Sequence, residues 1–513
     1  MARTQLPNPA LPRSPEDGLA GSGSAFDKPF TGGMRAVGIA GEGCPGYDRC
    51  VQARATSATS GGHYERLVRR QRAELQDAYL KGVRRLRWDT GRLAAERERR
   101  LRELLVWAAD RSPFWRERLA GRVPASFTES DLPSLPVLTR AEMMAEFDRV
   151  VTDPRLTLAR IQQHLDLPDG DRGYMDDEYQ AIITSGYIGT QAVHVYGWDA
   201  FVTFVMQGSR WTGRRGEDPE AVLAQAFATS TRHESGIFHD FSTFESGGPQ
   251  SHCSGGTQPL DEIVDGLNNA RPAVQALQAW PSLMRELALE SIAGRLTIKP
   301  TWVSVAGEVC TPPVREAIRS AWGIETSEFW GCSEGTYAFP CGVGEGMHVA
   351  DDLVILEPAD ADGNVVPYGQ PAERLLLTNL FNLTQPLIRY DLVDAVTMSD
   401  EPCPCGCAHR RVTAVNGRID GAFEYESGAL VPRAAFEQTV LATPGVADFF
   451  VGKTQRGVDV SVVTDGSCDL QHLRVELVGV LRRHGGPESD VVVQEVGSID
   501  RLWSGKSKQF DAR

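Results

Sequence analysis

The stretch Ile183–Thr190, "ITSGYIGT", sets two glycines three residues apart, Gly186 and Gly189, directly after a Thr-Ser pair. Glycines let backbone N–H groups converge on an anion, and the hydroxyls of Thr184 and Ser185 add further donors. The same residues are typical of a tight turn between strands, and no Gly-Lys-Ser/Thr triplet follows as in a Walker loop. The stretch alone leaves a phosphate-binding loop and a plain turn open.

Bulk composition limits the classes of protein to consider. A chain of 513 residues is expected to form two or more domains, and its net charge of −15 argues against nucleic acid or an anionic membrane as the main partner. The sequence has no apolar run of transmembrane length, and its N-terminal residues do not look like a secretory signal. The ten cysteines are therefore expected to be reduced or metal-binding, in a cytoplasmic protein.

The alternation of short apolar runs with helical patterns predicts an α/β protein. We expect a large N-terminal multi-sheet α/β domain and a small, mobile α+β C-terminal domain. The predicted divisions are a flexible N-terminal extension (1–60), the large domain with a helical leader (61–417), a hinge (418–420) and the small domain (421–513).

Local patterns predict individual elements. Residues 64–119 repeat apolar side chains at helical spacing and predict two or three amphipathic helices, and Thr139 is expected to cap a helix beginning at Arg140. A helical pattern also covers 264–290. After residue 432 the pattern predicts a helix, a hairpin, a helix and a strand.

A second candidate site lies in "SEFWGCSEGTYAF". Trp330 precedes Gly331 at the end of a strand-like run, and Ser333 and Glu334 follow. An aromatic face can stack on a purine, and a carboxylate can hold the magnesium that accompanies a polyphosphate. A buried tryptophan beside a surface glutamate is the structural alternative.

Three later stretches carry further polar groups. Asp394 ends a strand-like run that begins "LLLTNL", and a carboxylate there can accept both hydroxyls of a ribose. Arg418 and Asp420 stand at the expected domain boundary, which suits a hinge or a plain linker. Lys506 and Lys508, on a turn near the C-terminus, could stabilise charge on a reacting phosphate or form a solvated basic tail.

The order of these stretches resembles that of the adenylate-forming superfamily of acyl-CoA synthetases, adenylation domains and luciferases. Within it the chain looks like the phenylacetate-CoA ligase branch from about Arg97 to the C-terminus. The segments "LPVLTRAEM", "VAGEVCTPPVREAI", "PLIRYDLVDA", "CPCG" and "NGRID" follow one another in the family's order.

The resemblance implies an ATP- and Mg²⁺-dependent ligase of catabolism or specialised metabolism. It would activate a carboxylate, usually aromatic, as an acyl-AMP with release of pyrophosphate, and pass it to a thiol such as CoA or to an amine. Glu334 would bind Mg²⁺, Lys506 would be the catalytic lysine with Lys508 as the fallback, and Asp420 would be the hinge. The residues implied to contact ATP are Thr184, Ser185, Gly186, Gly189, Gly307, Glu308, Trp330, Gly331, Ser333, Asp394 and Arg418.

Alternatives remain open at this point. The same half-reaction could serve amide formation, or activation of nitrite to diazotise an aromatic amine, and a degenerate nucleotide-binding scaffold is a third option. The region 208–259 is expected to line part of the acyl pocket. A pocket for a simple arene would usually be less polar than one that contains His233, Glu234, His239 and His252. The expected partners are thus a small acid or oxyanion and its acceptor. The oligomeric state is open, with a homodimer among the options.

A cysteine-rich segment suggests a second metal. Cys403 and Cys405, with Cys341 and His348, supply four N/S ligands for a closed tetrahedral zinc site that would join two loops. A similar cluster has this role in the phenylacetate-CoA ligase branch, although Cys407 stands where the branch usually has arginine. Reduced free thiols are the alternative.

The phosphate loop departs from the family pattern. Where the family usually has a Thr-Thr pair and a following lysine, this chain has Tyr187, Ile188 and Thr190, so hydroxyl donors and a positive charge are missing. We therefore expect Tyr187→Thr to lower the KM for ATP, measured as pyrophosphate release at varied ATP. An unchanged or higher KM would contradict this explanation of the departure.

Overall fold

A computed structural model describes most of the chain, and all the described residues fall in the compact unit Ile39–Arg513. They are residues 70, 74–75, 77–168, 174–184, 191–211, 221–228, 230, 232–236, 251–253, 256–418 and 421–511. The extension expected at 1–60 therefore lies outside the described residues. None of the described helices is long and apolar enough to cross a bilayer.

Helices form the N-terminal part of the described chain, as predicted. α3 (Thr90–Arg111) buries one face, and Ser112 then caps α4 (Pro113–Leu119) by accepting a hydrogen bond from the backbone of Trp115. Thr139 caps α5 (Arg140–Ala145) through the backbone N–H of Glu142, which confirms the expected start. Three short helical elements complete this part: η1 (Glu129–Ser134), α6 (Phe147–Val150) and α7 (Leu158–Leu165).

The largest sheet that the structure describes has ten strands in the order β11-β14-β15-β9-β8-β7-β6-β5-β3-β4. The strands from β4 to β7 pair in parallel, and those from β7 to β11 pair antiparallel. The bounds are β3 Leu223–Ala226, β4 Ser251–Cys253, β5 Ala276–Ala279, β6 Trp302–Ala306, β7 Ser327–Cys332, β8 Thr336–Pro340, β9 Met347–Val349, β11 Pro371–Ala372, β14 Asp394–Ser399 and β15 Arg411–Arg418.

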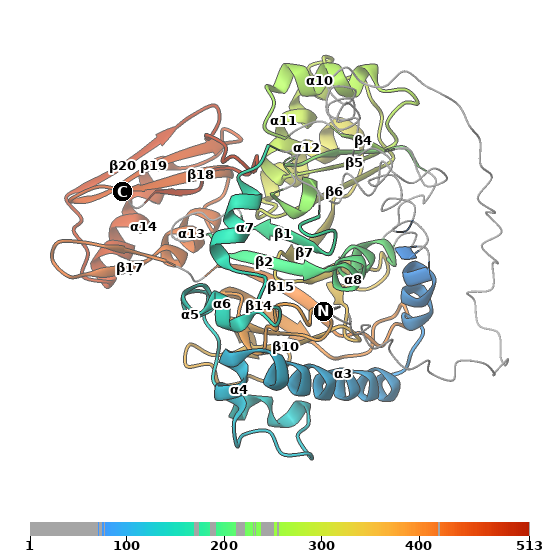
Figure 1. The fold of residues 1–513 in the computed structure, drawn as a ribbon. Coiled ribbons are helices and arrows are strands. Elements are labelled where there is room, and N and C mark those ends of the chain that lie inside the picture. The colour runs from blue at the N-terminus through green and yellow to red at the C-terminus, as the bar shows by residue number, and fades with distance from the viewer. Residues whose placement is uncertain are drawn as a thin grey trace. The chain divides into compact units, whose positions relative to one another are not determined.

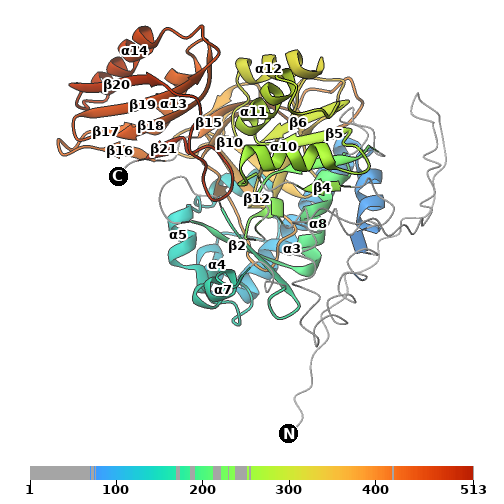
Figure 2. The same ribbon diagram turned by 90° about the horizontal axis from the view of Figure 1, so that it is seen from above.

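Three helices accompany the parallel strands: α10 (Leu260–Asn269), α11 (Pro281–Ile292) and α12 (Pro312–Trp322) (Figure 1 and Figure 2). Every residue of β5 and β6 is buried, as expected for parallel strands covered by helices. The single helical pattern predicted over 264–290 is therefore wrong in its middle, where β5 separates α10 from α11. Pro272 and Pro281 interrupt the pattern on either side of that strand.

Smaller sheets adjoin the large one. β1 (Tyr179–Ile183) and β2 (Val193–Gly197) form an antiparallel hairpin followed by α8 (Trp198–Ser209). β10 (Val354–Ala359), β12 (Arg374–Asn379) and β13 (Tyr390–Asp391) form another antiparallel sheet. Asp394 opens β14 instead of ending the run that begins in β12, because a separate short strand, β13, intervenes.

The C-terminal residues have a core of their own, which includes Phe423, Phe436 and Phe449. The order helix, hairpin, helix and strand is confirmed (red in Figure 1), and the four-stranded sheet runs β20-β19-β18-β21. The α/β fold class is likewise confirmed, whereas Asp420 lies outside the described residues, so the hinge stays a prediction. The bounds are β16 Ala422–Glu424, β17 Leu430–Pro432, α13 Arg433–Leu441, β18 Val446–Lys453, β19 Gly457–Thr464, α14 Leu470–Arg483, β20 Asp490–Glu495 and β21 Phe510–Asp511.

Candidate active site

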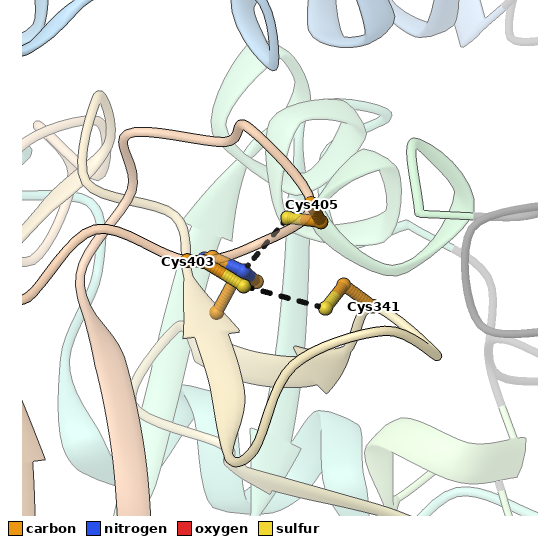
Figure 3. A group of neighbouring side chains, drawn as sticks. Cys341, Cys403 and Cys405 are labelled. Carbon is orange, nitrogen blue, oxygen red and sulfur yellow. Dashed lines mark hydrogen bonds between the residues drawn. The ribbon is translucent and has the colours of Figure 1, made fainter. Parts of the chain in front are cut away.

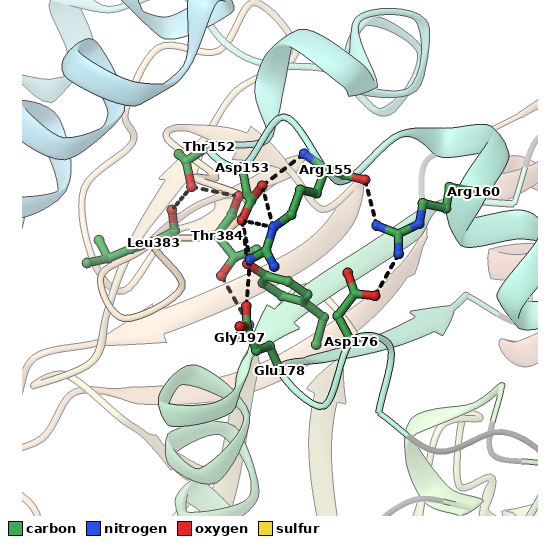
Figure 4. A network of polar contacts seen from close by, with 10 residues as sticks. Thr152, Asp153, Arg155, Arg160, Asp176, Glu178, Gly197, Leu383 and Thr384 are labelled. Carbon is green, nitrogen blue, oxygen red and sulfur yellow. Dashed lines mark hydrogen bonds and ion pairs between the residues drawn. The ribbon is translucent and has the colours of Figure 1, made fainter. Parts of the chain in front are cut away.

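The hairpin that carries the glycine stretch is anchored at the end away from that stretch (Figure 4). The Tyr179 hydroxyl donates to Asp153 at 2.6 Å, and Gly197, which pairs with Tyr179, donates its backbone N–H to Thr384 at 3.1 Å. Burial alone would raise the pKa of Asp153, but hydrogen bonds from Arg155 and Tyr179 lower it to about 2. The connecting loop therefore extends from a fixed base.

The described edge of that loop is also ordered by hydrogen bonds. The backbone of Thr184 donates to the Ala192 carbonyl at 3.0 Å, and the Thr184 hydroxyl accepts from the Ala192 N–H at 3.1 Å. Ser185, Gly186 and Gly189 lie outside the described residues. Of the predicted phosphate loop, the structure thus describes Thr184.

A tight turn between β7 and β8 holds the second candidate stretch. A side chain at Gly331 would lie 2.0 Å from the Tyr337 ring, so only glycine fits there. The carbonyls on the turn are held from outside: Tyr196 donates to Ser333 at 2.5 Å, and Asn379 donates to Glu334 at 3.0 Å. The backbone on both sides of the Glu334 side chain is therefore fixed.

The Glu334 carboxylate is buried beside a histidine. It is 4% exposed, and its Oε1 lies 3.6 Å from Nε2 of His194. Burial raises the pKa of Glu334, but His194, Arg140 and Arg418 together outweigh burial and lower it to about 2. An ionised carboxylate is the state that a magnesium ligand requires.

Asp394 and Arg418 face each other across the neighbouring strands β14 and β15. They are partners in the strand register, and a guanidinium nitrogen of Arg418 lies 3.6 Å from the Asp394 carboxylate. Arg418 is also close enough to Glu334 and Lys506 to shift their pKa values. The structure thus brings Glu334, Asp394, Arg418 and Lys506 into one electrostatic cluster.

Lys506 reaches this cluster from the C-terminal turn. Its ammonium lies 4.7 Å from the centre of the Trp280 ring, and Trp280 packs so closely on Gly307 that a Cβ there would lie 2.3 Å from the ring. Burial lowers the pKa of Lys506, while the carboxylates of Glu234 and Glu308 act in the opposite direction. Lys508 instead pairs with Asp511 at 2.8 Å.

Both carboxylate oxygens of Glu308 accept a hydrogen bond from a backbone N–H group. Oε2 accepts from the Ser282 N–H at 3.0 Å, and Oε1 accepts from the Ser507 N–H at 2.6 Å.

Trp330 is buried in β7, as a packing residue or a residue that stacks on adenine would be. The Ser333 hydroxyl donates to Glu234, so it joins β7 to the segment that carries His233 and Glu234.

Sequence reasoning missed His194, Trp280 and Arg140. Trp280, just before α11, and His194 reach the cluster from segments without a recognised motif, whereas Arg140 lies in the segment "LPVLTRAEM", which suggested a helix start and no charged role. The signal for His194 is its place in β2, because a histidine among apolar residues on the face that also carries Tyr196 interrupts the apolar pattern. His194 and Tyr196 are both fully buried.

The four predicted zinc ligands converge, although His348 lies in β9 and only the three thiols, shown in Figure 3, lie in loops. Among the described residues, the ligand atoms of Cys341, His348, Cys403 and Cys405 lie within 4.8 Å of one another. The Cys341 and Cys403 sulfurs are 3.7 Å apart, and the Cys405 sulfur is 3.4 Å from Nε2 of His348. A tetrahedron with zinc–sulfur bonds of about 2.3 Å has edges of about 3.8 Å, so the donor set fits the ion.

A second shell supports these ligands. Nδ1 of His348 donates to the His409 carbonyl at 2.7 Å, which leaves Nε2 free to face the thiols. Trp211 stacks on the His348 ring with 5.3 Å between centres. Cys407 donates its backbone N–H to the Cys405 sulfur and is not one of the four clustered ligands.

Two known proteins, one similar in sequence and one similar in fold, are CoA ligases. The chain is 25% identical over 431 residues to a phenylacetate-coenzyme A ligase of Thermus thermophilus, a match that covers 79% of this chain and 86% of the relative. This match bears out the predicted resemblance to the phenylacetate-CoA ligase branch of the adenylate-forming superfamily. No protein-family model matches it.

Solved structures of another CoA ligase have a similar fold. A 2-hydroxyisobutyryl-CoA ligase in the postadenylation state, in complex with R3-HIB-AMP, has a TM-score of 0.60 at 18% identity, over 82% of this chain and 90% of that chain. The same ligase in the thioesterification state, in complex with 2-HIB-AMP and CoA, has a TM-score of 0.50 at 20% identity, over the same shares. The predicted fold is thereby confirmed.

The contact between His194 and Glu334 predicts a pH-dependent stability. Because the folded pKa of about 2 is below the ordinary value of 4.5, ionised Glu334 stabilises the fold above pH 4.5 and loses this effect as the pH falls toward 2. Without His194 the folded pKa rises. We expect His194→Leu to lower the free energy of unfolding by about 1–2 kcal/mol more at neutral pH than near pH 3.

Urea unfolding at the two pH values measures this difference. Val195→Ala is the matched control, because it removes packing on the other face of β2 and should destabilise the fold equally at both pH values. An equal deficit for His194→Leu at both pH values would contradict the assigned interaction.

Proposed function

We propose that this chain is an ATP-dependent, AMP-forming acid ligase. The observation that carries the proposal is the cluster of buried and partly buried charges, in which Lys506 from the C-terminal turn lies near the carboxylates of the large sheet. On this proposal the substrate carboxylate attacks the α-phosphorus of ATP, the bond to pyrophosphate breaks, and an acyl-AMP forms. The chain is thus an enzyme of the AMP-forming ligase class.

Each charged residue has a role in this proposal. Glu334, ionised and buried, suits the Mg²⁺ that accompanies ATP. Asp394 suits the ribose hydroxyls, with Arg418 beside it. Lys506 would stabilise the charge that builds up on the α-phosphate, and its partial burial among carboxylates strengthens that electrostatic effect. The other nucleotide contacts follow the predicted set, with Trp330 beside adenine and Thr184 at the edge of the phosphate loop.

CoA is the proposed acceptor, and an aromatic acid is the proposed substrate. The named relatives are CoA ligases, which supports the thiol acceptor. Aromaticity rests on the phenylacetate-specific name of one relative, whereas the other acts on a hydroxy acid. Amide formation and nitrite activation use the same first step, so the choice among them is made by experiment.

Zinc at the cysteine cluster is proposed as a structural ion. Cys341, His348, Cys403 and Cys405 would hold it with no open position for a substrate, which is typical of a structural site. The ion would join the loop after β8 to the loop between β14 and β15.

Lys506→Ala should slow the formation of acyl-AMP by about a hundredfold or more, because no other described lysine faces the cluster. ATP–pyrophosphate exchange across aryl acids, amino acids and nitrite provides the measurement and identifies the substrate. Lys508→Ala is the matched control from the same turn and should retain exchange. Equal rates for wild type and Lys506→Ala would reject the assignment, and no exchange with any acid would favour the degenerate scaffold.

Purified protein should hold about one equivalent of zinc, because the four ligands form a closed set. Cys403→Ser should reduce the content below about half an equivalent and lower the melting temperature, as metal analysis and thermal unfolding would measure. Cys407→Ser is the control, since Cys407 is not one of the clustered ligands. Zinc-free wild-type protein would leave the cysteines as reduced thiols.

A further inference from the structure

The Lys506 turn is held at a second point, away from the lysine side chain. Glu308, at the start of the loop after β6, bridges the Ser507 N–H at 2.6 Å and the Ser282 N–H at 3.0 Å. Ser282 stands in the first turn of α11, where backbone N–H groups are otherwise unpaired and the helix end is positive. One carboxylate thus joins the helix to the residue next to Lys506.

A second carboxylate supports the same residue from the other side. The Ser507 hydroxyl donates to Asp448 of β18 at 2.7 Å, and Ser507 is 1% exposed. Arg501 adds bonds from its guanidinium to the Ser282 hydroxyl at 3.2 Å and the Gly505 carbonyl at 3.1 Å, and it pairs with Glu286 of α11 at 2.9 Å. Ser507 is therefore held through both its backbone and its side chain.

The turn itself is internally braced, so holding one residue fixes its neighbours. Leu502 donates to the Lys506 carbonyl at 2.7 Å, Gly505 donates to Leu502 at 2.8 Å, and Lys508 donates to the Asp500 carbonyl at 2.7 Å. The Lys506 ammonium must be placed within a fraction of an ångström of a reacting phosphate to be effective. A restraint on the adjacent residue is a direct way to place it.

We propose that Glu308 is a positioning residue for Lys506, and that it acts by clamping the Ser507 N–H to the start of α11. This inference rests on the proposed function for its catalytic consequence, but the clamp itself is a contact that can be measured without catalysis. It assigns Glu308 a task different from the ATP contact that the family resemblance implies. The two roles predict different kinetics.

Glu308→Gln separates these roles. The amide keeps the size of the side chain, but its NH₂ group cannot accept a hydrogen bond, so one of the two backbone contacts is lost. We expect kcat for ATP–pyrophosphate exchange to fall about tenfold or more while KM for ATP changes less than about twofold, since positioning affects the transition state. A raised KM with unchanged kcat would overturn the proposal in favour of a nucleotide contact.

Hydrogen exchange of the Ser507 amide is the readout that does not depend on activity. Loss of its acceptor should speed exchange in the peptide covering residues 502–508 about tenfold in Glu308→Gln. Glu290→Gln is the matched control, because this carboxylate lies on α11 and pairs with Arg295 instead of the turn. It should leave both exchange and kcat at the wild-type level.

A second variant keeps the test decisive if Glu308→Gln does not fold. Ser507→Ala removes the hydrogen bond from the Ser507 hydroxyl to Asp448 but keeps the Ser507 backbone N–H. It should therefore lower kcat by a smaller factor than Glu308→Gln and leave the KM for ATP unchanged. Wild-type kcat in both variants, or unchanged amide protection in Glu308→Gln, would overturn the clamp. If wild-type enzyme catalyses no exchange with any acid, the proposed function fails, while the amide measurement still decides whether the clamp exists.

Discussion

The candidate site depends on keeping opposite charges close together where water is scarce. Glu334 shows the constraint most clearly, because a carboxylate with 4% exposure would take up a proton unless cationic groups surrounded it. His194, Arg140 and Arg418 come from three separate parts of the chain, and together they outweigh burial. The same arrangement supplies neighbours of both signs to Lys506, whose charge would otherwise be costly to bury.

The large sheet is what allows these groups to meet. The turn between β7 and β8 carries Glu334, and the register of β14 and β15 puts Asp394 opposite Arg418. The first turn of α11 points backbone N–H groups at Glu308, which in turn contacts the C-terminal turn. Glycines at 307 and 331 are needed because aromatic rings occupy the space of their side chains. Packing and charge placement are therefore set by the same backbone.

The fold class and the charged groups that the structure brings together could be predicted from the sequence, but the residues that surround those groups could not. The α/β alternation, the cap at Thr139 and the C-terminal order of elements are local patterns, so one chain suffices to find them. β5 was missed because "VQALQAW" is compatible with a helix until parallel neighbours are known. His194, Trp280 and Arg140 act only through contacts between distant segments, which no spacing in the sequence reveals.

Glu308 illustrates the difference between recognising a residue and knowing its task. A Gly-Glu pair at the end of a strand implies a nucleotide contact by resemblance, and the residue does lie beside Lys506. Each oxygen of its carboxylate nevertheless accepts a backbone N–H, one from α11 and one from the catalytic turn. A carboxylate committed in this way resists rotation, because either new orientation would leave a buried N–H without an acceptor. On the proposed function, the rigidity of Glu308, more than its charge, would place Lys506 against the phosphate.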